Sequence, residues 1–208
     1  LKGVKLHDYT HLLMVDGSYS AISKELKSRI ATWVKDGGIL IAIQSGATWA
    51  ESLCFKSSGC DEEKSVEKAG EAEQVNKAYA DFDDQKSQRT IAGAIVNVEF
   101  DGTHPVAFGY QGSGPLFRRG EVLLKTSENA FTTPARYAKE PLLSGYIGEQ
   151  RLSEMSGQAA IIAERQGNGL VVRFANNPLF RGFWRGTERL WVNSLYFGPM
   201  VNNTELPK

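Results

Sequence analysis

A strand–helix–strand pattern near the start of the chain constrains the fold more than any other feature. Residues 12–15 form a short apolar segment that predicts a strand. Apolar residues spaced by three and four then predict a helix up to Val34, with Ser20 as its N-cap. A glycine pair ends this helix, and the apolar residues 39–43 predict a second, buried strand. Two strands joined by a helix pair in parallel, so the sequence predicts an α/β fold.

The second strand runs into a tight turn of small residues, Gln44-Ser45-Gly46. This is the outline of a nucleophile elbow, the sharp strand-to-helix turn that lifts one side chain above the edge of a sheet. The central position holds Gln44, and a neighbouring base cannot turn an amide into a nucleophile. The sequence therefore predicts the geometry of a catalytic site without its chemistry, which favours a binding or structural module over a hydrolase.

Composition limits the partners that this chain can have. Basic and acidic side chains number 24 each, so there is no basic excess to attract nucleic acid. No apolar run reaches the roughly 20 residues that a membrane helix needs. We expect neither partner. The length suits one domain over residues 1–208, and a start at Leu1 without Met indicates a C-terminal piece of a longer protein.

Two small groups of side chains resemble metal sites only on paper. Cys54 and Cys60 lie six positions apart, either bonded to each other or as free thiols, without the CxxC spacing of a zinc or redox motif. His7, Asp8 and His11 lead into a strand, where a spacing of four does not bring two side chains together as it does on a helix. We expect no metal in this chain.

The remainder of the chain predicts further strands and one insertion. Residues 61–85 are charged, with few apolar positions, and predict an exposed helical insertion. Residues 109–120 are rich in glycine and predict a surface loop. The expected strands cover 91–100, 122–124, 159–164 and 170–174, of which the last two form a hairpin, and the final helix covers 187–197.

Several short motifs are spread over most of the chain, apart from residues 51–78. They include Trp33-Val34-x-x-Gly37-Gly38, Gly46-Ala47-x-Trp49, Thr103-His104-Pro105, Leu142-Leu143-Ser144-Gly145-Tyr146 and Phe180-Arg181-Gly182-Phe183-Trp184. Together they resemble a C-terminal domain of bacterial secreted zinc carboxypeptidase-like proteins of the carboxypeptidase A type. That domain is similar to the class I glutamine amidotransferases. The resemblance implies a flavodoxin-like three-layer sandwich, with a mostly parallel sheet and a late antiparallel hairpin.

The resemblance also implies that the amidotransferase triad is lost. Active members carry a cysteine where this chain has Gln44, and a His-Pro-Glu run where it has Asn177-Pro178-Leu179. Asparagine cannot act as a general base, and leucine cannot orient one. Hydrolysis of glutamine is therefore not expected.

The first functional hypothesis, from the resemblance, is a non-catalytic accessory or binding domain of a secreted or periplasmic zinc carboxypeptidase-like protein. Its partners would be the upstream peptidase domain and a peptide or cell-wall substrate. Zinc is expected in the peptidase domain of that protein, with no cofactor in this chain. The alternatives are a stand-alone serine hydrolase that uses Ser45 and His104, or a small-ligand sensor at the elbow.

Two sets of residues follow as candidates for contact with ligands or partners. Ligands of open α/β sheets bind outside the carboxyl ends of the strands, so the first set surrounds the elbow. This vestigial pocket comprises Asp16, Gly17, Ser18, Gln44, Ser45, Gly46, His104 and Asn177. The second set comprises Arg181, Phe183, Trp184 and Arg185. These residues form either an interface with a partner or part of the packing of the last helix.

Overall fold

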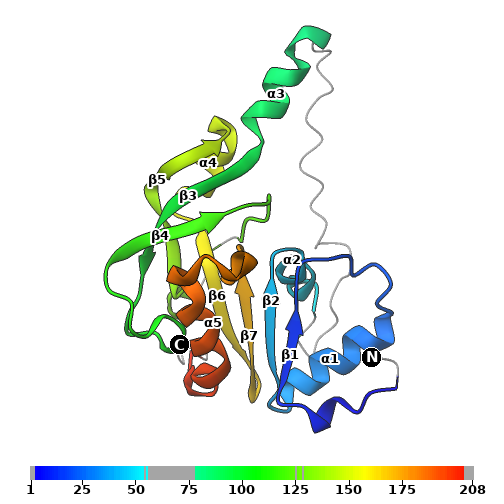
Figure 1. The fold of residues 1–208 in the computed structure, drawn as a ribbon. Helices are drawn as coiled ribbons and strands as arrows, with labels where there is room; N and C mark the ends of the chain where they lie inside the picture. Colours follow the sequence, from blue (N-terminus) through cyan, green and yellow to red (C-terminus); the bar gives the residue numbers. More distant parts are fainter. Residues whose placement is uncertain (1–2, 54, 56–77, 125, 128, 204–208) are drawn as a thin grey trace.

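A computed structural model describes residues 3–53, 55, 78–124, 126–127 and 129–203 of the chain (Figure 1). Cys54, Cys60 and most of the charged stretch at 61–85 lie outside these residues. The described end of that stretch is helical, with a 3-10 turn at Tyr79–Asp81 followed by α3 at Phe82–Gln88.

The core of the fold is a seven-stranded sheet in the order β1-β2-β7-β6-β5-β3-β4. In chain order the strands are β1 His11–Met14, β2 Ile39–Ile43, β3 Ile91–Phe100, β4 Ser113–Arg118, β5 Ala135–Ile147, β6 Ala159–Gln166 and β7 Gly169–Phe174. Strands β1, β2 and β7 are parallel neighbours, as the strand–helix–strand pattern predicted for the first two. The other four pairings are antiparallel.

The sheet is therefore mixed, and the expectation of a mostly parallel sheet is wrong for the sheet as a whole. A parallel neighbour needs a long crossover, whereas antiparallel strands can follow one another through short turns. Only the turn Gly167-Asn168 separates β6 from β7, which pair from Gln166↔Gly169 to Ile161↔Phe174. This confirms the late hairpin.

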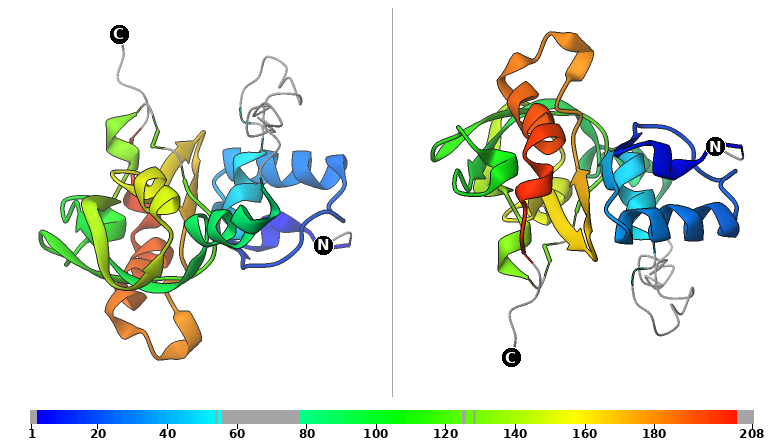
Figure 2. Two further views of the ribbon diagram at one scale, coloured as in Figure 1. Left: turned by 90° about the horizontal axis from the view of Figure 1, so that it is seen from above. Right: turned by 90° about the horizontal axis from the view of Figure 1, so that it is seen from below.

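Helices cover both faces of the parallel end of the sheet. Helix α1, Lys24–Lys35, and helix α2, Ser45–Glu51, pack on one face, and α5, Glu188–Tyr196, packs on the other. Seen from above and below, α5 and the α1–α2 pair stay on separate sides of the molecule (Figure 2). Helices α3 and α4, Glu149–Met155, lie beyond the end of the β3–β5 pair, away from α1 (Figure 1).

Strand β2 shows why the core has two halves. All five of its residues are buried, and successive side chains point to opposite faces. Ile39, Ile41 and Ile43 join the half covered by α5, whereas Leu40 and Ala42 join the half covered by α1 and α2. This central position, apolar on both faces, fixes the elbow that follows at its carboxyl end.

Helix α1 begins later than the sequence indicates. Its N-cap is Ser23, whose hydroxyl accepts a hydrogen bond from the backbone N–H of Leu26, and not Ser20. A separate hydrogen bond between the Ser23 side chain and the Glu25 carboxylate lowers the pKa of Glu25 in the first turn. Ser20 stays in the preceding loop, where it lines a cavity described below.

Two other expectations fail in the antiparallel half. Residues 109–120 are not a surface loop, because β4 occupies Ser113–Arg118 and pairs with β3. Residues 122–124 form only an isolated bridge, from Leu124 to Ala159, instead of a strand. Glycine within a half-exposed edge strand produced the first error, since pairing to a neighbour overrides local turn propensity.

Strand β5, the longest in the sheet, was not predicted at all. Its pairing with β3 shifts register at three places, and Gly145, opposite Ala94, lies between two of them with a φ of +93°. A β-carbon there would collide with the carbonyl oxygen of Gly93. The irregular register lets the two long strands bend away from the sheet toward α3 and α4.

Candidate functional site

The turn between β2 and α2 has the backbone shape of an elbow, as the sequence predicted. Gln44 lies between the strand and the helix with φ 51° and ψ −117°, a conformation that costs an L-residue strain. Its backbone N–H donates to the carbonyl of Phe174 at 2.8 Å, which fastens the turn to β7. Helix α2 starts at once at Ser45.

Gly46 allows the elbow to sit against the end of β1. A β-carbon at this position would lie 2.6 Å from the carbonyl oxygen of Met14 and 3.1 Å from that of Val15. Both contacts are with backbone atoms, which cannot swing aside as a flexible side chain can. The small residue two positions after the elbow is therefore required by packing, whatever chemistry the elbow carries.

The amide of Gln44 is held by a loop from the far side of the sheet. Its Nε2 donates to the carbonyl oxygen of Arg119 at 2.9 Å. Arg119 directly follows β4, so the loop after the edge strand β4 reaches the elbow on β2. The side chain at the centre of the elbow is here a structural contact between two distant parts of the chain.

Arg118 anchors that loop and was not recognised from the sequence. The side chain is fully buried and donates to the carbonyl of Ala175 at 2.9 Å, to Oδ1 of Asn176 at 2.8 Å and to the carbonyl of Val122. Its guanidinium lies 5.9 Å from the ring centre of Tyr137, whose hydroxyl accepts from Nδ2 of Asn176. The alternation of buried Leu116 with position 118 is the period-two signal that could have placed this arginine inside.

Ser45 is bound to the end of the β1 segment. Its Oγ lies 2.6 Å from Oδ1 of Asp16 and 2.9 Å from the carbonyl of Gly17, and it accepts from the N–H of Gly17 at 2.7 Å. The N–H of Ser45 also donates to Asp16 at 3.3 Å. Ser18 is exposed and faces Ser20 at 3.2 Å between hydroxyls. Asp16, Gly17 and Ser45 are thus brought together, as expected.

Asn177 follows β7, but its side chain closes a local turn. Its Oδ1 accepts from the backbone N–H of Leu179 at 2.9 Å. The neighbouring Asn176 is the buried one, with only 2% of its surface exposed, and it belongs to the Arg118 group. The structure therefore places two amides near the carboxyl end of β7, each engaged with the protein.

His104 is not brought to the elbow. It follows β3, and three strands separate β3 from β2, so at about 4.8 Å per strand the two lie roughly 19 Å apart in the sheet. Its Nδ1 accepts from the N–H of Val106 at 3.1 Å, which caps a 3-10 turn at Pro105–Ala107. Burial lowers the pKa of this histidine, with Asp101 opposing the shift. The histidine is therefore part of a local turn and not of the vestigial pocket.

The aromatic group after β7 is only partly core. Phe180 lies 4.4 Å from Phe117 of β4 between ring centres, and Trp184 lies 6.0 Å from the same ring. Phe183 is 66% exposed, as an anchor for a partner would be. Arg181 is exposed, stands over Phe180 at 5.3 Å and has a φ of 52°. The exposed Arg185 pairs with Glu188 at 3.5 Å.

No group of three or more metal-ligating side chains converges within the part of the chain that the structure describes. The ring of His11 is engaged on both sides, with Nδ1 2.9 Å from the hydroxyl of Thr10 and Nε2 3.0 Å from the carbonyl of Leu195. Among the described residues, no helix is long and apolar enough to span a membrane.

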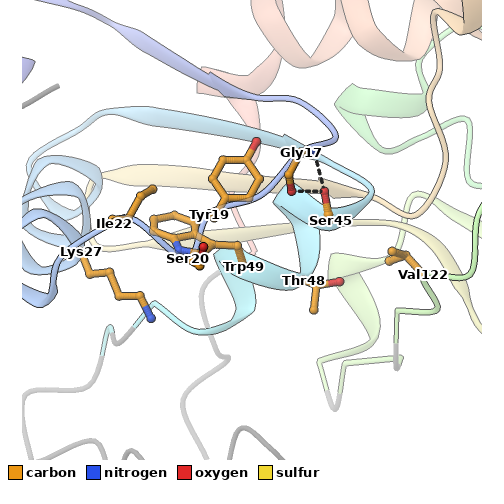
Figure 3. Close-up of a pocket in the computed structure, with 9 residues that line it drawn as sticks. All are labelled: Gly17, Tyr19, Ser20, Ile22, Lys27, Ser45, Thr48, Trp49 and Val122. Atoms are coloured by element: carbon orange, nitrogen blue, oxygen red, sulfur yellow. Dashed lines mark hydrogen bonds between the residues drawn. The ribbon is translucent and has the colours of Figure 1, made fainter.

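A cavity of about 470 Å³ opens beside the elbow (Figure 3). It shares Gly17 and Ser45 with the vestigial pocket but extends along α2 and α1, away from Gln44 and Asn177. The wall is completed by Tyr19, Ser20, Ile22, Lys27, Thr48, Trp49 and Val122. None of these seven residues was expected at a site. Tyr19 and Lys27 follow β1 and Trp49 follows β2, so the available signal was their place after two neighbouring parallel strands.

Comparison with known proteins gives no family assignment. No protein-family model and no curated protein match this sequence. Among solved structures, a cytoplasmic protein from Salmonella typhimurium is 16% identical with a TM-score of 0.44, covering 92% of this chain and 72% of its own. A protein described as ThuA-like, from Parabacteroides merdae, is 11% identical with a TM-score of 0.49, covering 99% and 76%. Likenesses this distant carry no argument about function.

Proposed function

We propose that residues 1–208 form a non-catalytic, glutamine amidotransferase-like domain that serves as an accessory or binding module of a zinc carboxypeptidase-like protein. The flavodoxin-like part of this proposal corresponds to the parallel strands β1, β2 and β7 with helices on both faces. The carboxypeptidase part rests on the sequence motifs alone. On that resemblance the zinc and the peptidase chemistry belong to the upstream domain.

The observation that carries the non-catalytic part is the side chain at the elbow. Gln44 occupies the position of the nucleophile and donates its amide to the carbonyl of Arg119. Nucleophilic catalysis needs a side chain that a base can deprotonate, with the base within hydrogen-bond reach. Neither Gln44 nor the turn-forming Asn177 meets this requirement.

The geometry disfavours the serine hydrolase alternative. Ser45 Oγ faces a carboxylate and two backbone groups, whereas His104 follows β3, which three strands separate from β2, and uses its Nδ1 in a turn. A Ser–His–Asp triad requires the imidazole between the hydroxyl and the acid. Ser45 contacts Asp16 directly, so no imidazole stands between the hydroxyl and the acid to carry the proton.

The partner-binding role has a candidate surface in the exposed aromatic group after β7. Phe183 and Trp184 stand beside Arg181 and Arg185, a mixture of aromatic and arginine side chains that is typical of interface anchors. We assign this surface to the contact with the upstream peptidase domain. A peptide or cell-wall strand held by that domain is the expected substrate of the whole protein.

The catalytic half of the proposal is tested on this chain alone. Glutamine and activated-ester hydrolysis are measured for the wild type, for Ser45→Ala and for Gln44→Cys. We expect no turnover above buffer in any of the three, because Asn177 cannot act as a general base and His104 lies away from the elbow. Turnover by the wild type that is lost in Ser45→Ala would overturn this conclusion.

The accessory half is tested on the native protein. The intact mass of the polypeptide that carries this segment should lie well above 22.9 kDa, and that polypeptide should bind zinc and release C-terminal amino acids. Phe183→Ser should expose the link between its domains to limited proteolysis, whereas Tyr79→Ser, at an even more exposed aromatic elsewhere, should not. A native mass near 22.9 kDa would refute the accessory role.

A further inference from the structure

The cavity beside the elbow is formed by three elements that meet at the carboxyl end of β1. The loop after β1 contributes Tyr19 and Ser20, α1 contributes Lys27, and α2 contributes Thr48 and Trp49 (Figure 3). Its volume of about 470 Å³ lies within the usual range of small-ligand sites, roughly 300–1,000 Å³. The space therefore suits a small molecule and is too small for a folded partner.

Two aromatic rings form an apolar wall. The rings of Tyr19 and Trp49 lie 5.8 Å apart between centres at 38°, and Ile22 extends the same wall. The hydroxyl of Tyr19 donates to the carbonyl of Val15, which holds the loop against the end of β1. Trp49 is only 9% exposed, and its Nε1 has no acceptor among the described residues. A buried indole N–H without a partner is a cost that a ligand acceptor would remove.

Lys27 brings a positive charge to this apolar wall. Its Nζ lies 6.0 Å from the centre of the Trp49 ring. Among the residues that the structure describes, Lys27 has no carboxylate within ion-pair distance. The side chain of Thr48, exposed on the opposite rim, is likewise free of internal hydrogen bonds in the described part of the chain. Within the described residues, the cavity thus combines a cation without an ion-pair partner, a hydroxyl and an aromatic surface.

These features select the charge of the ligand. Lys27 already stands over the face of Trp49, so a cationic ligand on that ring would meet like charge. Among the residues that the structure describes, Lys27 is the one cation that lines the cavity. Burial raises the pKa of Tyr19, and the nearby Asp16 adds to this rise. A dianionic phosphate would therefore be poorly compensated, whereas a single negative charge is matched by Lys27.

We propose that this cavity binds a small organic carboxylate whose body is aromatic or branched aliphatic. The carboxylate pairs with Lys27, the apolar body packs on Tyr19, Ile22 and Trp49, and the hydroxyl of Thr48 stands on the opposite rim. The site differs from the elbow, because neither Gln44 nor Asn177 lines it. The inference is independent of the proposed accessory role, since binding is measured on this chain and that role on the native polypeptide.

The test is a titration of the ¹⁵N-labelled chain, followed by NMR, with a matched pair of probes. N-acetylphenylalanine carries the carboxylate, and N-acetylphenylalaninamide has the same body without the charge. We expect saturable shifts of the Trp49 indole N–H, identified by its absence in Trp49→Phe, with the acid bound about threefold to fivefold more tightly than the amide. Acetate and inorganic phosphate, which lack the body, should give no saturation at about 10 mM.

Charge variants on one helix decide the role of Lys27. Lys27→Gln should remove the preference for the acid over the amide, while Lys35→Gln, on the same helix but outside the cavity, should retain it. Equal binding of acid and amide by the wild type would overturn the proposal. So would loss of the preference in both variants, or the absence of saturable shifts at Trp49 with either probe.

Discussion

The parallel and antiparallel halves of the sheet are built differently. Strands β2 and β7 are short and buried along their whole length, between helices on both faces. Strands β3 and β5 extend over 10 and 13 residues, with many exposed positions and repeated shifts of register. The parallel half is a compact layer between helices. The antiparallel half is a long, bent pair of strands that extends away from that layer.

The edge of the sheet that carries the elbow and the cavity nevertheless depends on both halves. The elbow and the cavity lie at the carboxyl ends of β1 and β2, in the parallel half. The loop that covers the elbow comes from β4 in the antiparallel half and is held there by Arg118. The comparison teaches that a site can be placed by one half of a sheet and closed by the other.

Replacing Arg118 should have the largest effect on this connection. Arg118→Met removes three hydrogen bonds and leaves buried acceptors at Ala175 and Asn176 without partners, so we expect a loss of roughly 2–4 kcal/mol in the free energy of unfolding. Urea denaturation measures it. The exposed neighbour offers a control, because Arg119→Met should change stability by less than about 0.5 kcal/mol. Similar losses in both variants would show that Arg118 does not join the halves.

A change at Gly46 should disturb the parallel half alone. In Gly46→Ala the new methyl group meets the carbonyl of Met14 at 2.6 Å, and the backbone must move at a cost of about 1–3 kcal/mol. Thermal unfolding of Gly46→Ala and Gly17→Ala gives the comparison, since a β-carbon at Gly17 meets no atom within 4 Å. A Gly46→Ala protein as stable as Gly17→Ala would argue against close packing of the elbow on β1.

The strain at Gln44 predicts an unusual order of stability. Gln44→Gly relieves the backbone at φ 51°, ψ −117°, whereas Gln44→Ala keeps the strain, and both lose the contact to Arg119. The glycine variant should be the more stable of the two by about 1 kcal/mol, after the greater freedom of glycine in the unfolded chain is allowed for. The same pair at Arg181, whose φ 52° and ψ 19° are commonly allowed, should differ less. If chemical denaturation showed Gln44→Ala to be more stable than Gln44→Gly, the backbone at Gln44 would not be strained.

His104 gives the smallest expected effect and belongs to the antiparallel half. Burial lowers the pKa of its ring in the folded state, so between that value and the ordinary pKa near 6.5 only the unfolded chain takes up the proton. Stability therefore falls as the pH drops below about 6.5 and this contribution levels off below the folded pKa. His104→Asn, which retains an acceptor for the N–H of Val106, should lose less stability between pH 7 and 5. Identical pH profiles for the two proteins would exclude this contribution.

The parallel half of the sheet could be predicted from the sequence better than the antiparallel half. The strands and helix around residues 11–43, the elbow, and the hairpin of β6 and β7 all have local signals, namely spacing, glycine turns and short apolar runs. Strands β4 and β5 lack such signals, because their stability comes from pairing with β3 over a long separation in sequence. The buried Arg118 also has its partners 57 and 58 positions away, at Ala175 and Asn176.

By itself, the sequence determined the α/β class, the elbow after residue 43 and the absence of a nucleophile at its centre. Those properties depend on the identity of neighbouring residues and on short-range backbone preferences. The tertiary structure decided the mixed sheet, the separation of His104 from Ser45, the loop of Arg118 and Arg119 over Gln44, and the cavity between Tyr19, Lys27 and Trp49. These depend on which distant segments pack together, and packing of that kind is set by burial over the whole chain rather than by any local pattern.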